Sequence, residues 1–319
     1  MEKIPGKCSL VHLVIDVSPS MSEQVKKQVL QADKIVEDEI FNSIVGEACH
    51  GGVDKVCLAY ASLAAMLEYL HQARDLLRRP SLQRRLFSVS LLGLPPGDPR
   101  IPAVPPKPIV SVVDDYSEAR GRAASPVEAA AKALGLDAEW LRDLSRSEAR
   151  YTDGACASQG LRASLEAAAS VCSRLGRVLV LCFSDCCVND FEGQAERGRL
   201  DPAAAAEETR AALEQAAGEA GVESLNVVAL LYGNPALVEV EQGVCPLRAA
   251  RIADRLSALE LQFREVAEQL RGHPGLVADK TWAGIEVDGV PLKGYAVRRV
   301  RSPEALAHIL LVATTTATV

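Results

Sequence analysis

The feature that most constrains the fold of this chain is an uninterrupted apolar run at Val178–Phe183. A strand that is apolar on both faces needs cover on both faces, as a parallel strand has when helices pack on either side of its sheet. Other short runs also have strand character, and together they give five expected strands: Leu10–Ile15, Lys55–Tyr60, Leu86–Leu92, Arg177–Phe183 and Leu225–Tyr232.

Stretches with helical periodicity separate these runs. Between the first two, apolar residues recur every three or four positions, at Val25, Val29, Ala32, Val36 and Ile40. Further helices are expected at Leu63–Leu77, Pro126–Leu144, Gln159–Leu175, Pro202–Ala220, Pro246–Leu270 and Pro303–Leu311. Alternating strands and helices predict the α/β class, with a doubly wound, mostly parallel central sheet and helices on both faces.

A proline-rich segment interrupts this alternation. Gly93–Pro108 holds seven prolines in sixteen residues, which excludes both a helix and a central strand. We expect an extended surface segment. A stiff connector is the preferred interpretation, and a Pro-x-x-Pro motif that docks on a partner is the alternative. Together with the helical stretch after it, this segment predicts an insertion over residues 93–150 within a single domain spanning residues 1–319.

Composition narrows the class of protein. The chain has 319 residues, of which 48% are apolar and 24% charged, with a net charge of −7. The acidic balance argues against contact with nucleic acid or an anionic membrane through bulk charge. No stretch approaches the roughly 18–20 apolar residues of a membrane span, and the N-terminus lacks the apolar segment of a signal peptide.

The cysteines suggest a compartment. There are nine of them, an odd number, and several lie inside apolar runs. This pattern favours a reducing compartment over a disulfide scaffold. We therefore expect an intracellular protein, in the nucleus or the cytoplasm.

Candidate chemistry lies where two expected strands end. Asp16, Ser18 and Ser20 follow the first strand on a short loop, and Asp185 follows the strand that ends at Phe183. The carboxyl ends of parallel strands meet at one edge of a sheet, and carboxylates and hydroxyls with room for water suit Mg²⁺. A purely structural role is the alternative, in which Ser20 or Ser22 caps a helix and Asp16 braces the loop through backbone hydrogen bonds.

Other motifs favour no enzyme. The sequence has no phosphate-binding glycine loop and no Gly-x-Ser-x-Gly nucleophile elbow. A metal-dependent hydrolase built on Asp16 and Asp185 stays open as an alternative, but no histidine falls at an expected strand end. His12 is in mid-strand, as a core histidine would be, and Cys182, Cys186 and Cys187 lack the spacing of a zinc site.

The Asp-x-Ser-x-Ser motif at Asp16, Ser18 and Ser20, with Asp185 after a later strand, resembles the von Willebrand factor A (VWA) family and its metal-ion-dependent adhesion site. The resemblance covers residues 9–62, 150–234 and 276–312. It implies a non-enzymatic module that binds an acidic side chain of a protein partner through Mg²⁺, or one that works beside an AAA+ ATPase. Ala155 stands where the family has a threonine ligand, and Thr152 or Ser158 is the nearest substitute.

Short matches also resemble the N-terminal region of the Asunder-type subunit of the Integrator complex, a VWA-like fold with a decayed metal site. They lie at Ala65–Tyr69, Gly160–Leu161, Glu166, Cys172 and Ala313–Thr316. The resemblance implies a scaffold subunit of a nuclear RNA-processing assembly. That family continues beyond the point where this chain stops, so we expect residues 313–319 to form a strand of a truncated following region, in line with their composition.

Overall fold

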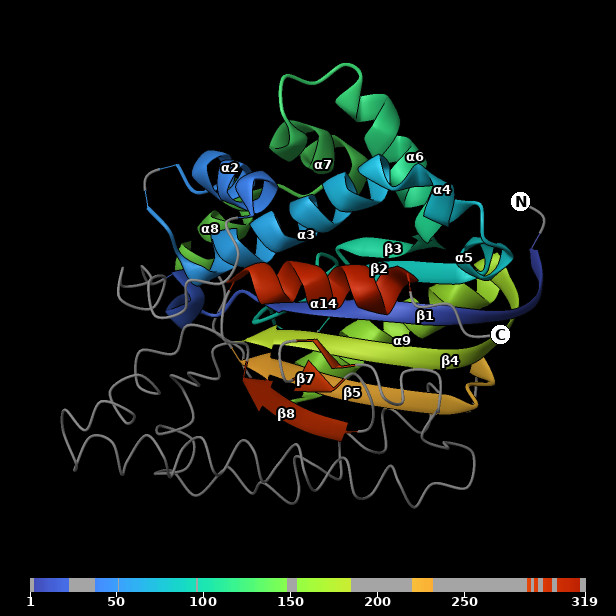
Figure 1. Cartoon of the computed structure of the whole chain (residues 1–319). Coiled ribbons are helices and arrows are strands. Elements are labelled where there is room, and N and C mark those ends of the chain that lie inside the picture. The colour runs from blue at the N-terminus through green and yellow to red at the C-terminus, as the bar shows by residue number, and fades with distance from the viewer. Residues whose placement is uncertain are drawn as a thin grey trace, which may run out of the picture.

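A computed structural model describes residues 3–22, 38–50, 52–95, 97–147, 154–184, 220–231, 286–287, 290–291, 295–299 and 303–315 of the chain. Its centre is a six-stranded sheet in the order β3-β2-β1-β4-β5-β8 (Figure 1). The strands are β1 (Ile4–Asp16), β2 (Arg85–Leu92), β3 (Val104–Pro108), β4 (Cys172–Ser184), β5 (Ser224–Leu231) and β8 (Tyr295–Arg299), and a separate short ribbon pairs β6 (Glu286–Val287) with β7 (Val290–Pro291).

The sheet is mostly parallel. Of the six strands in this sheet, only β3 runs antiparallel to its neighbour. Four expected strands are confirmed, because β1, β2, β4 and β5 cover the runs that begin at Leu10, Leu86, Arg177 and Leu225. The prediction of an α/β protein with a mostly parallel sheet is therefore confirmed.

Helices lie on both faces of the sheet (Figure 1). Alternate residues of β1 point to opposite cores. Leu13 and Ile15 join the core under α3 (Lys55–Gln72) and α14 (Pro303–Thr315), whereas Leu10 and Val14 join the core under α9 (Gly154–Val171). This alternation is what a strand apolar on both faces requires. The described helices are η1 (Pro19–Ser22), α2 (Glu39–Ala48), α3 (Lys55–Gln72), α4 (Arg74–Leu77), α5 (Pro80–Gln83), α6 (Ile109–Arg120), α7 (Pro126–Leu134), α8 (Ala138–Ser147), α9 (Gly154–Val171) and α14 (Pro303–Thr315).

The strand expected at Lys55–Tyr60 is wrong, because these residues begin the 18-residue helix α3. Asp54 caps this helix, since its Oδ1 accepts a hydrogen bond from the amide of Cys57 at 2.7 Å. Every residue from Lys55 to Glu68 is buried. A helix that is buried on all sides has no polar face, so its first turns give the same apolar run as a buried strand.

The segment after Gly93 contributes to both the sheet and the main core. Its prolines lie partly in β3, an edge strand, where a missing amide donor is tolerated. Residues of α6, α7 and α8 share the core of α3. The single helix expected at Pro126–Leu144 is wrong, because α7 ends at Leu134 and α8 begins anew at Ala138. Gly135, which follows α7, has a left-handed φ of 68°.

Two other expected boundaries also differ. The helix expected to reach Leu175 ends at Val171, and the residues after it belong to β4. Residues 313–315 continue α14, so the strand expected there is wrong for them. The hydroxyls of Thr314 and Thr315 donate to carbonyls one turn back, at 2.8 and 2.7 Å, which suits these residues to a helix.

Some expectations lie outside the described residues. They are residues 316–319, the helices expected at Pro202–Ala220 and Pro246–Leu270, and most of the helix expected between Val25 and Ile40.

Two disulfides contradict the expectation of reduced cysteines. Cys8 at the start of β1 is bonded to Cys172 at the start of β4, and Cys49 after α2 is bonded to Cys57 in α3. The first pair is 164 residues apart in the chain, so only the pairing of β1 with β4 brings its sulfur atoms together.

Of the helices in the described ranges, none has the length and hydropathy that a bilayer span requires.

Candidate metal centre

The carboxyl ends of β1 and β4 lie side by side. Ile15 of β1 pairs with Phe183 of β4, so the last residues of these strands, Asp16 and Ser184, reach the same edge of the sheet. The next strand along the chain, β2, lies on the other side of β1. The strand order therefore reverses between β1 and β4, and ligands of open α/β sheets bind outside the carboxyl ends of the strands at such a point.

A tight turn after β1 holds Asp16 and Ser18 together. Both residues are buried, at 3% and 1% exposed. The amide of Ser18 donates to Asp16 Oδ1 at 2.7 Å, and the amide of Val17 donates to the Leu92 carbonyl of β2 at 2.8 Å. Asp16 thus braces the turn through the backbone. A carboxylate has about four acceptor positions, so the same side chain has the capacity to serve as a cation ligand as well.

Ser22 is the other serine of this turn with a described side chain, and the start of the helix that it is expected to cap lies outside the described residues. Its hydroxyl donates to the Pro19 carbonyl at 2.8 Å inside η1. The amide of Met21 donates to the Ser18 carbonyl at 2.9 Å, which closes the first turn of the same element. The turn is therefore fixed by short local hydrogen bonds around Ser18.

Cys182 lies on β4 close to this edge. It is buried, and desolvation together with the nearby Asp16 carboxylate raises the pKa of its thiol to about 12. The thiol therefore stays protonated at neutral pH and is a poor metal ligand. Cys186 and Cys187 lie outside the described residues.

The structure brings together two of the six residues expected at the site, Asp16 and Ser18. For Ser20, in η1, and Ser158, in α9, it describes the backbone. Asp185 directly follows β4 in the sequence, and both it and Thr152 lie outside the described residues. Within the described ranges, no three His, Cys, Asp or Glu side chains are grouped closely enough to hold a metal ion. The donor set of one carboxylate and serine oxygens fits a hard cation that keeps several waters, as Mg²⁺ does.

Sequence reasoning missed the polar residues that support the turn. Ser145 of α8 is fully buried, and its hydroxyl donates to the Ser18 carbonyl at 2.8 Å. Arg142, also on α8, pairs with Asp54 at 2.6 Å. Ser145 and Ser18 are 127 positions apart, so no local pattern could reveal their contact.

His12 is a core histidine, as its position in mid-strand predicts. Its two ring nitrogens lie 2.8 and 3.0 Å from the hydroxyls of Ser88 and Ser90 on β2. Burial lowers its pKa to about 3. The ring is therefore neutral at physiological pH, and both of its nitrogens are already occupied.

Comparison with known proteins adds little to this geometry. No protein-family model matches the sequence, and no curated protein gives a significant match. Two solved structures are similar over 96% of this chain, namely the PilB minor pilin from Streptococcus sanguinis and a point mutant of it, each with 11% identity and a TM-score of 0.41. This chain covers 60% of the length of those pilin chains. At that TM-score the likeness supports no conclusion about fold or function. The class defined by the fold is thus a mixed α/β protein with a mostly parallel sheet.

Proposed function

We propose that this chain is a non-enzymatic protein–protein interaction module of the VWA type, with a Mg²⁺ site at the carboxyl edge of its sheet. The observation that carries the proposal is the position of Asp16 and Ser18, which are buried together where the strand order reverses between β1 and β4. Helices on both faces of the sheet also support the doubly wound arrangement that the VWA resemblance implies.

In this proposal Asp16, Ser18, Ser20 and Asp185 supply the oxygen ligands, and Thr152, Ser158 or a water replaces the threonine of the family. These residues would leave a coordination position of the cation open, and a carboxylate of the partner would bind there. The short hydrogen bond from the Ser18 amide to Asp16 Oδ1 fixes the orientation of the carboxylate before any cation binds. A fixed ligand loses less conformational entropy on binding, which favours affinity.

The partner is then a protein that presents an acidic side chain, within a larger assembly in which this chain is a scaffold subunit. A net charge of −7 would repel an acidic partner at long range. A cation held by Asp16 and Ser18 would reverse this repulsion locally through its positive charge. Docking should therefore depend on the divalent cation.

A hydrolase at the same edge would need a general base near Asp16. His12 precedes Asp16 on the same strand, but its ring lies between two serine hydroxyls and is fully buried. Its lowered pKa would make it a weak base. No observation on the described residues favours the hydrolase or the AAA+ alternative over the interaction module.

The resemblance to the Asunder-type subunit points to a nuclear assembly, and the two disulfides point away from one. Disulfides persist in oxidising compartments and are rare in the nucleus and the cytosol. Because Cys8–Cys172 and Cys49–Cys57 are both formed, we leave the nuclear RNA-processing role out of the proposal. A pull-down from native extract under oxidising conditions, read by mass spectrometry, would identify the partner.

Thermal melting with added Mg²⁺ or Mn²⁺ tests the cation site. We expect the parent to melt about 5 °C higher at a cation concentration about 100 times the dissociation constant, because binding stabilises the folded state. Asp16→Ala should not respond. Asp115→Ala, at an exposed carboxylate on α6, should respond like the parent. A parent without a cation-dependent shift would refute the cation site.

A further inference from the structure

Helix α8 is hydrogen-bonded to the Asp16 turn by one side chain. Ser145 lies in the last turns of α8, and its hydroxyl donates to the Ser18 carbonyl at 2.8 Å. The residue is 0% exposed, so water does not compete for this bond. The position of α8 therefore helps to fix the position of Ser18.

A second set of polar contacts holds the same helix through Arg142. Arg142, three residues before Ser145, donates from Nε to Asp54 Oδ2 at 2.6 Å. Its two terminal nitrogens donate to the carbonyls of His50 and Gly52, at 3.1 and 2.5 Å. Since a guanidinium group is planar and its donors are fixed, these three acceptors must keep their relative positions to bind it.

The three acceptors belong to one loop that a disulfide closes. Cys49 and Cys57 flank His50, Gly52 and Asp54, and the bond between them spans a sequence separation of 8 residues. Asp54 Oδ1 also accepts the amide of Cys57 at 2.7 Å, which ties the loop to the first turn of α3. The disulfide thus restricts the loop that holds Arg142.

We propose that α8 couples this disulfide-closed loop to the candidate cation site, with Arg142 and Ser145 as positioning residues, so that loss of the Cys49–Cys57 bond weakens cation binding. The inference rests on the proposed cation site. Reduction by a small dithiol transfers two electrons and two protons to the disulfide. Cys49 and Cys57 become thiols, and the dithiol closes to its own disulfide.

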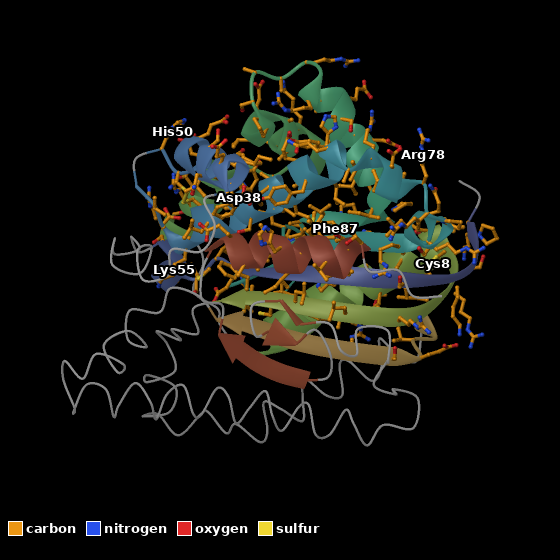
Figure 2. The ribbon with its side chains drawn as sticks, in the orientation of Figure 1. Cys8, Asp38, His50, Lys55, Arg78 and Phe87 are labelled. Carbon is orange, nitrogen blue, oxygen red and sulfur yellow. A yellow bond between two sulfur atoms is a disulfide. The ribbon has the colours of Figure 1, made fainter. Side chains whose placement is uncertain are left out.

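The other disulfide provides a matched control. Cys8 lies in the first half of β1 and bonds to Cys172, whereas Lys55, within the Cys49–Cys57 loop, lies on the opposite side of the molecule in Figure 2. Loss of Cys8–Cys172 should destabilise the fold without moving α8. Ser147→Ala provides a second control, because the Ser147 hydroxyl on the same helix is exposed and donates to the Asp143 carbonyl.

Isothermal titration with Mn²⁺ alone tests the proposal on the full chain, well below the melting temperature of every variant. We expect about tenfold weaker binding for Ser145→Ala and for the Cys49→Ser/Cys57→Ser double variant, the usual effect of removing a group that orients a metal ligand. Ser147→Ala and Cys8→Ser/Cys172→Ser should bind within about twofold of the parent. An unchanged dissociation constant in either of the first two variants would overturn the proposal, and so would equal weakening in the Cys8→Ser/Cys172→Ser control.

Hydrogen exchange separates this proposal from the cation site on which it rests. In the absence of metal, peptides that cover residues 16–22 should exchange faster in Ser145→Ala and in Cys49→Ser/Cys57→Ser than in the two controls. If the parent binds no Mn²⁺ and this difference is still seen, the proposed function fails and the coupling through α8 stands. Equal exchange in all variants refutes the coupling.

Discussion

Gly160 determines how closely α9 approaches the sheet. A Cβ atom at this position would lie 2.5 Å from Ser90 Oγ and 2.6 Å from Ser90 Cβ, and Ser90 is fixed by its hydrogen bond to His12. We expect Gly160→Ala to lower the free energy of unfolding by about 1–3 kcal/mol through overpacking. Gly46→Ala in α2 is the control, because nothing lies within 4 Å of its added Cβ. In a denaturant titration of both variants, Gly46→Ala should raise the free energy of unfolding by about 0.5–1 kcal/mol. Equal effects of the two substitutions would contradict this account.

His12 makes stability depend on pH. Burial lowers its folded-state pKa to about 3 from the ordinary histidine value of 6.5, so below about pH 6 the unfolded chain binds a proton that the folded chain does not. Stability should therefore fall as pH decreases from about 6 towards 3. The slope of unfolding free energy against pH is set by the number of protons that the chain takes up on unfolding. In His12→Gln this number should be lower by about one in this pH range. A parent-like slope in His12→Gln would contradict the assignment of this pH dependence to His12.

Among the helices and loops, the contact between α8 and the start of α3 depends on a buried ion pair. Arg142 and Asp54 are 2.6 Å apart, with side chains only 10% and 2% exposed. Arg142→Leu leaves the Asp54 carboxylate buried without this partner, so we expect a loss of about 3–5 kcal/mol in unfolding free energy. Arg146→Leu, one turn away at an exposed position, should change it by no more than about 0.5 kcal/mol. Similar losses in both variants would show that the pair adds nothing specific.

The helices and strands also show which parts of the fold sequence patterns can predict. The strands at Leu10, Leu86, Arg177 and Leu225 follow from apolar runs that a sheet covered on both faces requires. The run at Lys55 gives the same pattern for a different reason, because α3 is buried all round. Asp54 is a usable signal there, since it precedes 18 residues without Gly or Pro, and a capping residue before such a stretch is typical of a helix.

The candidate site also contains some residues that could be predicted from the sequence and others that could not. Asp16 and Ser18 could be predicted because the motif is local and parallel strands bring their carboxyl ends to one edge. Ser145, Arg142 and the disulfide pairs could not, since each contact joins residues that only tertiary packing brings together. Cys49 and Cys57 are close in sequence, but spacing alone does not distinguish a disulfide from two buried thiols.

For the whole molecule, the two disulfides should contribute unequally to stability. Cys8–Cys172 closes a loop with a sequence separation of 164 residues and Cys49–Cys57 one of 8 residues. Loop-closure entropy of the unfolded chain predicts contributions of about 5 and about 2.5 kcal/mol. Melting of Cys8→Ser/Cys172→Ser and Cys49→Ser/Cys57→Ser should show the larger loss in the first. The reverse order would mean that the unfolded chain is not what these bonds mainly restrict.

The central claim is that the molecule binds a divalent cation where the strand order reverses between β1 and β4. The most direct test is the anomalous difference density of a crystal grown with Mn²⁺. We predict a peak within bonding distance of the Asp16 carboxylate in the parent and none at this position in Asp16→Asn. A parent crystal that binds Mn²⁺ only elsewhere, or not at all, would contradict the account.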